Sequence, residues 1–275
     1  MAVDYAVKYA PQIDERFRLA SLTNGAVNND YDFIGVRTVK VYSIPTATLN
    51  DYTMSGMSRY GTPEELSATT QELTLTQDKA FTFTVDSRNN MDTNGALAAA
   101  TALTRQIEEV IVPMIDMYRL AKLAAGASAG ATTGITLTSS NAFAAMLGAE
   151  AWMTDHKVPV NGRVAFVTPR FYTTIRQDPL FMLPSEISMG IAINGMVGRV
   201  DGVPLVLVPT SYMPAAGIDV IMTHPVVMVG AQKLAEYRTT QDPPGISGML
   251  VEGRVYYDAF VLKNKADGIY VINGG

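Results

Sequence analysis

The longest amphipathic pattern in the chain runs from Thr93 to about Ala125. Arg105 precedes Glu109 by four residues, so on a helix the two side chains can pair. At 1.5 Å per residue the predicted helix is about 50 Å long, and it needs an equally long partner surface. Its apolar residues recur every three or four positions, as on one buried face of an α-helix: Leu97, Ala100, Leu103, Ile107, Val110, Ile111, Met114, Ile115 and Tyr118.

Pro113 interrupts this helical pattern. Proline has no backbone N–H, and its ring crowds the carbonyl of the residue four positions earlier, here Glu109. We therefore expect the helix to bend at Pro113 or to break into two pieces there.

The segment before the long helix alternates between strand patterns and core-poor stretches. Ile34–Ile44 is predicted to be a strand, and Glu72–Thr76 and Ala80–Asp86 a strand pair joined by a turn at residues 77–79. Thr46–Thr70 is rich in Thr, Ser, Gly and Tyr, and long segments with so few core residues are usually functional or disordered. We interpret it as an extended two-stranded loop held by another molecule, and disorder before assembly is compatible with this interpretation.

The amino-terminal stretch, Met1 to Asp32, holds one short amphipathic piece, Ile13–Leu22, followed by residues typical of loops. It has little apolar material for a core of its own. We interpret it as an arm that lies on other parts of the protein or on other subunits, and an ordinary terminal helix is the alternative.

After the long helix, helices and strands alternate and strands then dominate. Gly126–Gly134 is a predicted flexible linker, and Met182–Met196 is either an adaptable contact loop or core filling. This order predicts an α+β fold. The predicted elements are a helix at Asn141–Asp155 capped by Ser139 or Ser140, a strand at Val164–Val167, a helix that begins at Thr168 and Pro169 and ends before Pro179, and strands at Val203–Val208, Ile218–Met222, Met249–Lys263 and Ile269–Ile272.

Composition adds a reason to expect self-association. Charged residues make up 17% of the 275 residues, against about 25% in typical soluble proteins. The shortfall suggests that copies of the chain cover much of its surface, and a monomer of low charge is the alternative. The net charge of −5 and the lack of a Lys and Arg cluster argue against nucleic-acid binding through phosphate contacts.

The cysteine content and the lack of sorting signals bear on where the protein works. The chain has no cysteine, which excludes disulfides, thiolate metal sites and a cysteine nucleophile, and fits an intracellular protein. The amino terminus lacks the order of a signal peptide, and no run of about eighteen apolar residues is long enough for a membrane span. We expect a soluble protein without an export signal.

The search for catalytic motifs yields one weak match. Gly126–Gly130 has the Gly-x-Ser-x-Gly pattern around Ser128, with Asp201 or Asp219 and then His224 downstream, in the order of a serine hydrolase. That motif needs a strand before the serine and a helix after it, whereas here a long helix precedes, so a flexible linker explains the residues better. His156 is expected to cap a helix end. No catalytic, cofactor-binding or metal-binding residue is predicted.

The order of these parts resembles the major capsid proteins of tailed bacteriophages, the Johnson-fold family that also includes encapsulins. The features are the arm, the extended loop between strands, and the long helix, which matches the family's spine helix. The short runs that share this resemblance are Gly202–Val206, Gly253–Leu262 and Gly268–Tyr270. The resemblance covers nearly the whole chain as an order of parts.

The resemblance implies a domain plan. It comprises an amino-terminal arm (1–33), an extended loop with flanking strands (34–91), the spine helix of a peripheral domain (92–126), an axial domain (127–245), and carboxy-terminal strands that return to the core (246–275).

The resemblance also implies a function, a location and partners. We expect a structural major capsid protein that assembles with itself as hexamers and pentamers into an icosahedral phage head around double-stranded DNA. Assembly would take place in the host bacterial cytoplasm, with a separate scaffolding protein, a portal and a possible decoration protein. An encapsulin-like nanocompartment shell is the main alternative, and a phage tail protein and a serine hydrolase are further ones.

Overall fold

The structure is a computed structural model that describes residues 21–28, 30–31, 38–43, 46–63, 65, 68–88, 99–178 and 196–275. The predicted arm residues 1–20, residues 93–98 of the long helix and residues 182–195 of the Met-rich segment lie outside this part of the chain. The described elements are η1 (Asn24–Ala26), β1 (Thr38–Ser43), β2 (Thr69–Thr74), β3 (Gln77–Asp86), α3 (Ala99–Gln106), η2 (Ile107–Ile111), α4 (Val112–Ala125), β4 (Thr132–Gly134), α5 (Ala142–Asp155), β5 (Val164–Val167), α6 (Pro169–Arg176), β6 (Met196–Val200), β7 (Val203–Leu207), η3 (Thr210–Tyr212), β8 (Ile218–Thr223), η4 (Pro225–Val227), β9 (Met228–Gln241), β10 (Gly248–Val261), η5 (Lys263–Gly268) and β11 (Ile269–Asn273).

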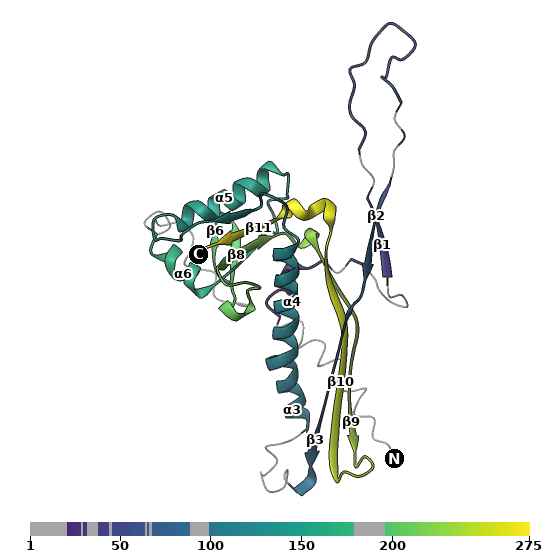
Figure 1. The fold of residues 1–275 in the computed structure, drawn as a ribbon, viewed down its shortest axis with the longest axis vertical. Helices are drawn as coiled ribbons and strands as arrows, with labels where there is room; N and C mark the ends of the chain where they lie inside the picture. The colour runs from purple at the N-terminus through teal and green to yellow at the C-terminus, as the bar shows by residue number, and fades with distance from the viewer. Residues whose placement is uncertain are drawn as a thin grey trace.

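The strands form three sheets (Figure 1). A six-stranded sheet has the order β4-β11-β8-β5-β7-β6, and a three-stranded sheet has the order β3-β10-β9. A separate antiparallel pair, β1 and β2, carries the loop that projects beyond the rest of the molecule (Figure 1). Helices and largely antiparallel sheets are therefore combined as in an α+β fold, as the sequence predicted.

Helices cover both faces of the six-stranded sheet because its strands alternate apolar residues between the two sides. On β5, Ala165 and Val167 pack in the cluster that contains Met146 of α5 and Phe171 of α6. Phe166 points to the other face, and its cluster includes the following apolar residues from α4, β8 and β11: Leu120, Leu123, Ile221 and Val271. The six-stranded sheet thus has an apolar cluster on each of its two faces.

The long helical rod, α3–η2–α4, packs on the three-stranded sheet. Leu103, Ile107, Ile111 and Ile115 share a buried cluster with Tyr237, Val251, Val255 and Tyr257 of β9 and β10. The predicted pairing of Arg105 with Glu109 is confirmed, because Arg105 Nε donates to Glu109 Oε1 over 3.0 Å. Val110 is an exception to the predicted buried face, since it is exposed.

Of the two outcomes expected at Pro113, the break into two pieces is wrong. Helical structure is continuous from Ala99 to Ala125, and Pro113 is the second residue of α4 (Figure 1). The irregularity lies one turn earlier, in the π-helical stretch Ile107–Ile111. In a π turn, backbone hydrogen bonds join residues five positions apart. The hydrogen-bond pattern of the helix therefore changes just before the proline.

Several other predictions need correction. The predicted strand pair within residues 72–86 does not form, because β2 pairs with β1 and β3 pairs with β10. Strands β6 and β9 were not predicted, and residues 132–134 of the predicted linker form β4. The first residue before α5 is Asn141 rather than Ser139 or Ser140, and its Oδ1 accepts a hydrogen bond from the backbone of Thr138. The cap of α6 is confirmed, since the Thr168 hydroxyl accepts from the backbone N–H of Phe171.

Candidate assembly surface

The projecting loop carries the densest group of exposed apolar side chains in the described part of the chain. Met57 is 107% exposed and Met54 88% exposed relative to an extended reference. Leu49, Tyr52 and Tyr60 are also exposed, and Tyr42 is exposed at the base of the loop. Contiguous exposed apolar surface is typical of sites that bind another macromolecule.

The loop has internal order although it projects from the body. The backbone N–H of Thr53 donates to the Arg59 carbonyl over 3.1 Å, and the Ser58 hydroxyl donates to the Gly61 carbonyl over 2.6 Å. The rings of Tyr52 and Tyr60 pack edge to face with their centroids 5.0 Å apart. The tip is therefore a shaped surface.

The described end of the amino-terminal arm is attached to the long helix through buried polar groups. The Asp116 carboxylate accepts hydrogen bonds from the Ser21 hydroxyl (2.6 Å), the Thr23 hydroxyl (2.6 Å) and the backbone N–H of Leu22 (2.9 Å). The Arg119 guanidinium donates to the Thr23 hydroxyl over 3.1 Å, and burial lowers the pKa of Arg119. Arg119 nevertheless keeps its charge beside the Asp116 carboxylate.

The arm then joins the edge of the three-stranded sheet. Asn28 exchanges backbone hydrogen bonds with Met228 and Gly230, at 2.8 and 3.1 Å. A β-carbon at position 230 would lie 2.1 Å from a methyl of Val27, so only glycine admits this close approach. Residues 21–28 thus belong to the folded body, and the arm leaves it from a fixed point.

A polar hollow of about 490 Å³ lies beside α5. Glu150 of α5 and Asp201 of the β6–β7 turn both line it, and the buried Arg163 lies behind them. Arg163 donates to the carbonyls of Pro159 (3.0 Å) and Val158 (2.7 Å) and to the Thr154 hydroxyl (3.1 Å). Burial and the hydrogen bond and negative charge of Asp201 raise the pKa of Glu150 to about 7.

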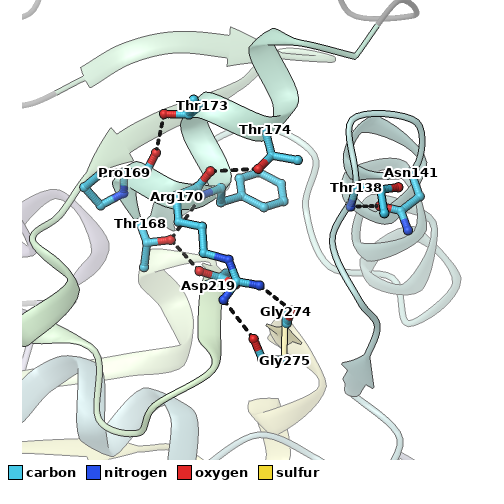
Figure 2. Close-up of polar contacts among 11 residues, drawn as sticks. Thr138, Asn141, Thr168, Pro169, Arg170, Thr173, Thr174, Asp219, Gly274 and Gly275 are labelled. Carbon is cyan, nitrogen blue, oxygen red and sulfur yellow. Dashed lines mark hydrogen bonds and ion pairs between the residues drawn. The ribbon is translucent and has the colours of Figure 1, made fainter.

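The residues of the weak hydrolase match, Asp219 and His224, have other partners. Figure 2 shows Asp219 with Thr168 and Arg170, and its Oδ1 accepts from the Thr168 hydroxyl over 2.6 Å. His224 donates from Nε2 to the Asn161 carbonyl (2.9 Å) and accepts at Nδ1 from the backbone of Val226 (3.2 Å). Both ring nitrogens are therefore used, and neither is available to take a proton from Ser128.

The same close-up explains what Asp219 and its neighbours do instead. Arg170, in the first turn of α6, donates to the carbonyls of Gly274 (2.6 Å) and Gly275 (2.8 Å) and so attaches the residues that follow β11 to α6 (Figure 2). His156 caps α5 as predicted, since its Nδ1 donates to the Trp152 carbonyl over 2.8 Å.

The described residues show neither a metal-binding group nor a membrane-spanning helix. No group of three or more His, Asp and Glu side chains is placed to hold a metal ion within the described ranges. None of the helices described combines the length and the apolar character that a bilayer crossing requires.

Solved structures with the same fold include phage proteins and a virus-like particle protein. A chain of Mycobacterium phage Che8 superposes with a TM-score of 0.70 and 19% identity, covering 92% of this chain and 90% of that one. The capsid of cyanophage P-SCSP1u gives 0.69 and 10% identity, covering 87% and 84%. The virus-like particle from Pyrococcus furiosus gives 0.56 and 12% identity, covering 98% and 100%.

The sequence comparisons identify the family. No curated protein sequence matches the chain. The family model described as phage capsid protein matches residues 68–272, which is most of the chain and includes the three-stranded sheet and all but the last residue of the six-stranded sheet. The resemblance stated from the sequence is thereby confirmed: the chain belongs to the phage capsid protein family, and its role is that of a structural major capsid protein of a phage head.

Proposed function

We propose that this protein builds an icosahedral phage head from hexamers and pentamers of itself, and that the projecting loop and the arm tie neighbouring subunits together. The observation that carries the proposal is the exposed apolar surface of the loop, from Leu49 to Tyr60. Apolar side chains left exposed by the fold of one chain lower the free energy of the system when a second copy covers them. The low proportion of charged residues, 17%, supports the same conclusion.

The proposed domain plan follows the sheets. The long helix and the three-stranded sheet would form the peripheral domain, and the six-stranded sheet the axial domain around the centre of a capsomer. Because β9 and β10 are hydrogen-bonded along their length, the expected boundary at 245 falls in the turn of one hairpin. We therefore place β9 in the peripheral domain, with the boundary near residue 228.

The proposed activity is assembly, without catalysis. The head would enclose double-stranded DNA without sequence-specific contacts, which agrees with the net charge of −5. Assembly in the host bacterial cytoplasm would use a separate scaffolding protein and a portal, and a decoration protein is a possible further partner.

Deletion of residues 51–65 tests the role of the loop. The shortened protein should remain folded, because the apolar clusters of the body do not include these residues. It should fail to form shells, as seen by electron microscopy of protein expressed with its neighbouring genes. Normal shells from the deleted protein would overturn the proposed role of the loop.

A nanocompartment shell is the second candidate function. It is favoured by the superposition on the virus-like particle from Pyrococcus furiosus, which covers 98% of this chain. Purification of particles from the native cell distinguishes the two. Particles that contain an enzyme and no DNA would support the compartment, and particles with a portal vertex and packaged DNA would support the phage head.

A further inference from the structure

The base of the projecting loop is fastened to the body by a dense set of contacts, which we call the loop joint. It comprises residues 71–76, which run from β2 to the start of β3, together with the carboxy-terminal part of β10 and residues 262 and 263. Only Leu75 and Thr76 separate β2 from β3, although these two strands belong to different sheets. The direction of the loop relative to the body is therefore decided over very few residues.

Gln71 bonds the loop base to the end of β10. Its side-chain Nε2 donates to the Val261 carbonyl over 2.9 Å, and its Oε1 accepts from the backbone N–H of Lys263 over 3.0 Å. One side-chain amide thus satisfies a backbone acceptor and a backbone donor of the body, as a neighbouring strand would. Both bonds depend on the loop base lying at one position along β10.

Asp258 of β10 holds the other end of the joint. This carboxylate is 3% exposed, and it accepts from the Thr76 backbone N–H (2.8 Å), the Thr76 hydroxyl (2.7 Å) and the Tyr118 hydroxyl of α4 (2.7 Å). Burial and the hydrogen bond to Asp258 raise the pKa of Tyr118 to about 12, so Tyr118 remains a donor at physiological pH. Three elements meet at one buried charge: the loop base, the long helix and β10.

Apolar packing closes the joint between these two polar contacts. Leu73 and Leu75 are fully buried and pack with Val229, Ala231 and Leu262. The Tyr256 hydroxyl also donates to the Leu75 carbonyl over 3.1 Å. A hinge needs few buried contacts and exposed backbone bonds, and the loop joint has the opposite properties.

We infer that the loop joint is a positioning device: Gln71 and Asp258 fix the direction in which the loop leaves the body before any neighbour binds it. Strands rise about 3.3 Å per residue, so the dozen or so residues from Ser43 to the tip reach up to about 40 Å, and a 10° rotation at the joint moves the tip by about 7 Å. In a shell of the kind proposed above, such a displacement changes how neighbouring subunits fit together and therefore the curvature of the shell. This consequence rests on the proposed function.

The absence of cysteine from the chain makes a direct test straightforward. Met57→Cys at the tip and Val160→Cys on the body place spin labels at two exposed positions. The distance distribution between the labels is measured by pulsed electron paramagnetic resonance on unassembled protein diluted with unlabelled protein, so that only pairs within one chain contribute. The wild-type background should give a narrow distribution.

Gln71→Ala should at least double the width of that distribution, and Thr76→Val, which removes the hydroxyl bond to Asp258 and keeps the backbone one, should broaden it less. Thr70→Ala, at an exposed position on the same strand, is the matched control and should leave the width unchanged. Equal widths in all variants, or a wild-type distribution as broad as that of Gln71→Ala, would overturn the inference. Circular dichroism confirms that each variant is folded.

A second measurement separates this inference from the proposed function. Gln71→Ala should still form particles, but their diameters should spread over a wider range than those of wild type and Thr70→Ala in electron micrographs. Equally uniform Gln71→Ala particles would overturn the link to curvature. If the wild type itself forms no particles, the proposed function fails, while the distances within one chain still decide whether the joint is rigid.

Discussion

The six-stranded sheet and the projecting loop use apolar residues in opposite ways. In the sheet, five of the six residues of β8 and four of the five of β11 are buried within the chain. In the loop, Met54 and Met57 are almost fully exposed. Both regions are apolar, but only the first finds its partners within the same molecule.

The apolar residues that stabilise the fold of one chain are therefore different from those that are available for assembly. A buried side chain contributes to the free energy of unfolding of a single chain, whereas an exposed one contributes only after a neighbour has covered it. Substitutions should therefore divide into those that change the unfolding free energy and those that change self-association alone.

Phe166→Ala should have the largest effect. Phe166 is fully buried in the six-stranded sheet against residues of α4, so the substitution leaves a cavity and should lower the unfolding free energy by about 3–5 kcal/mol. Urea unfolding of the unassembled protein measures the change. Phe166→Leu, which keeps most of the volume, is the control and should cost far less. A cost below about 1 kcal/mol for Phe166→Ala would mean that this sheet does not carry the stability of the body.

Asp116→Asn should come next. It leaves the buried Arg119 without a neighbouring carboxylate and replaces an acceptor of three hydrogen bonds by a weaker one, so about 3 kcal/mol should be lost. Thr23→Val removes one hydroxyl and should cost about 1 kcal/mol. Urea unfolding gives both values. Hydrogen exchange at Leu22 should become faster in Asp116→Asn, and unchanged exchange would show that Asp116 does not hold the arm.

The sequence predicted the elements whose signals are local. The strand Val164–Val167 and the helix after it were predicted because Thr168 and Pro169 provide a cap and a first turn next to each other. The long helix followed from its periodic spacing. The exposed loop could also be predicted, since a segment with few core residues between strands has no partner within the chain.

The elements that were missed depend on distant partners. Asp78 suggested a turn, but it lies in β3, which pairs with the distant strand β10, and Arg254 of β10 bonds both of its carboxylate oxygens. Strand β9 is interrupted by an irregularity opposite Tyr256 and Tyr257, so the period-two alternation of its residues is not continuous along the strand. The loop joint was not predicted because no pattern near Gln71 indicates that its amide bonds to residues 261 and 263.

Glu150→Gln should have a smaller effect that depends on pH. The pKa of Glu150 is raised from its ordinary value of 4.5 to about 7, so the folded state binds more protons than the unfolded state between these values. The stability that Glu150 contributes is therefore present below about pH 4.5 and lost as the pH rises through about 7. The difference between wild type and Glu150→Gln should change by on the order of 1 kcal/mol over this window, after allowance for solvent screening.

Urea unfolding at pH 4.5, 6 and 8 measures this difference. Asp155→Asn is the control, because it removes a carboxylate from the same hollow and leaves Glu150 in place. A wild-type to Glu150→Gln difference that stays constant with pH would show that the Glu150 carboxyl titrates with an ordinary pKa.

The double substitution Met54→Ser and Met57→Ser should have the smallest effect on unfolding and a large effect on assembly. Both side chains are exposed in the single chain, so the unfolding free energy should stay within about 0.5 kcal/mol of wild type. Covering each methionine in an assembly contributes up to about 1.5–3 kcal/mol, so the protein concentration needed for shell formation should rise by tenfold or more. Light scattering during assembly measures that concentration.

Val160→Ser provides the matched control, because Val160 is an exposed apolar residue outside the loop. If it raises the assembly concentration as much as the loop substitutions do, general surface hydrophobicity and not the loop drives association. If the loop substitutions instead lower the unfolding free energy by more than about 1 kcal/mol, the two methionines have partners within their own chain. The sheet and the loop would then no longer differ in where their apolar residues find partners. An unchanged unfolding free energy with impaired assembly would instead assign the loop surface to contacts between subunits.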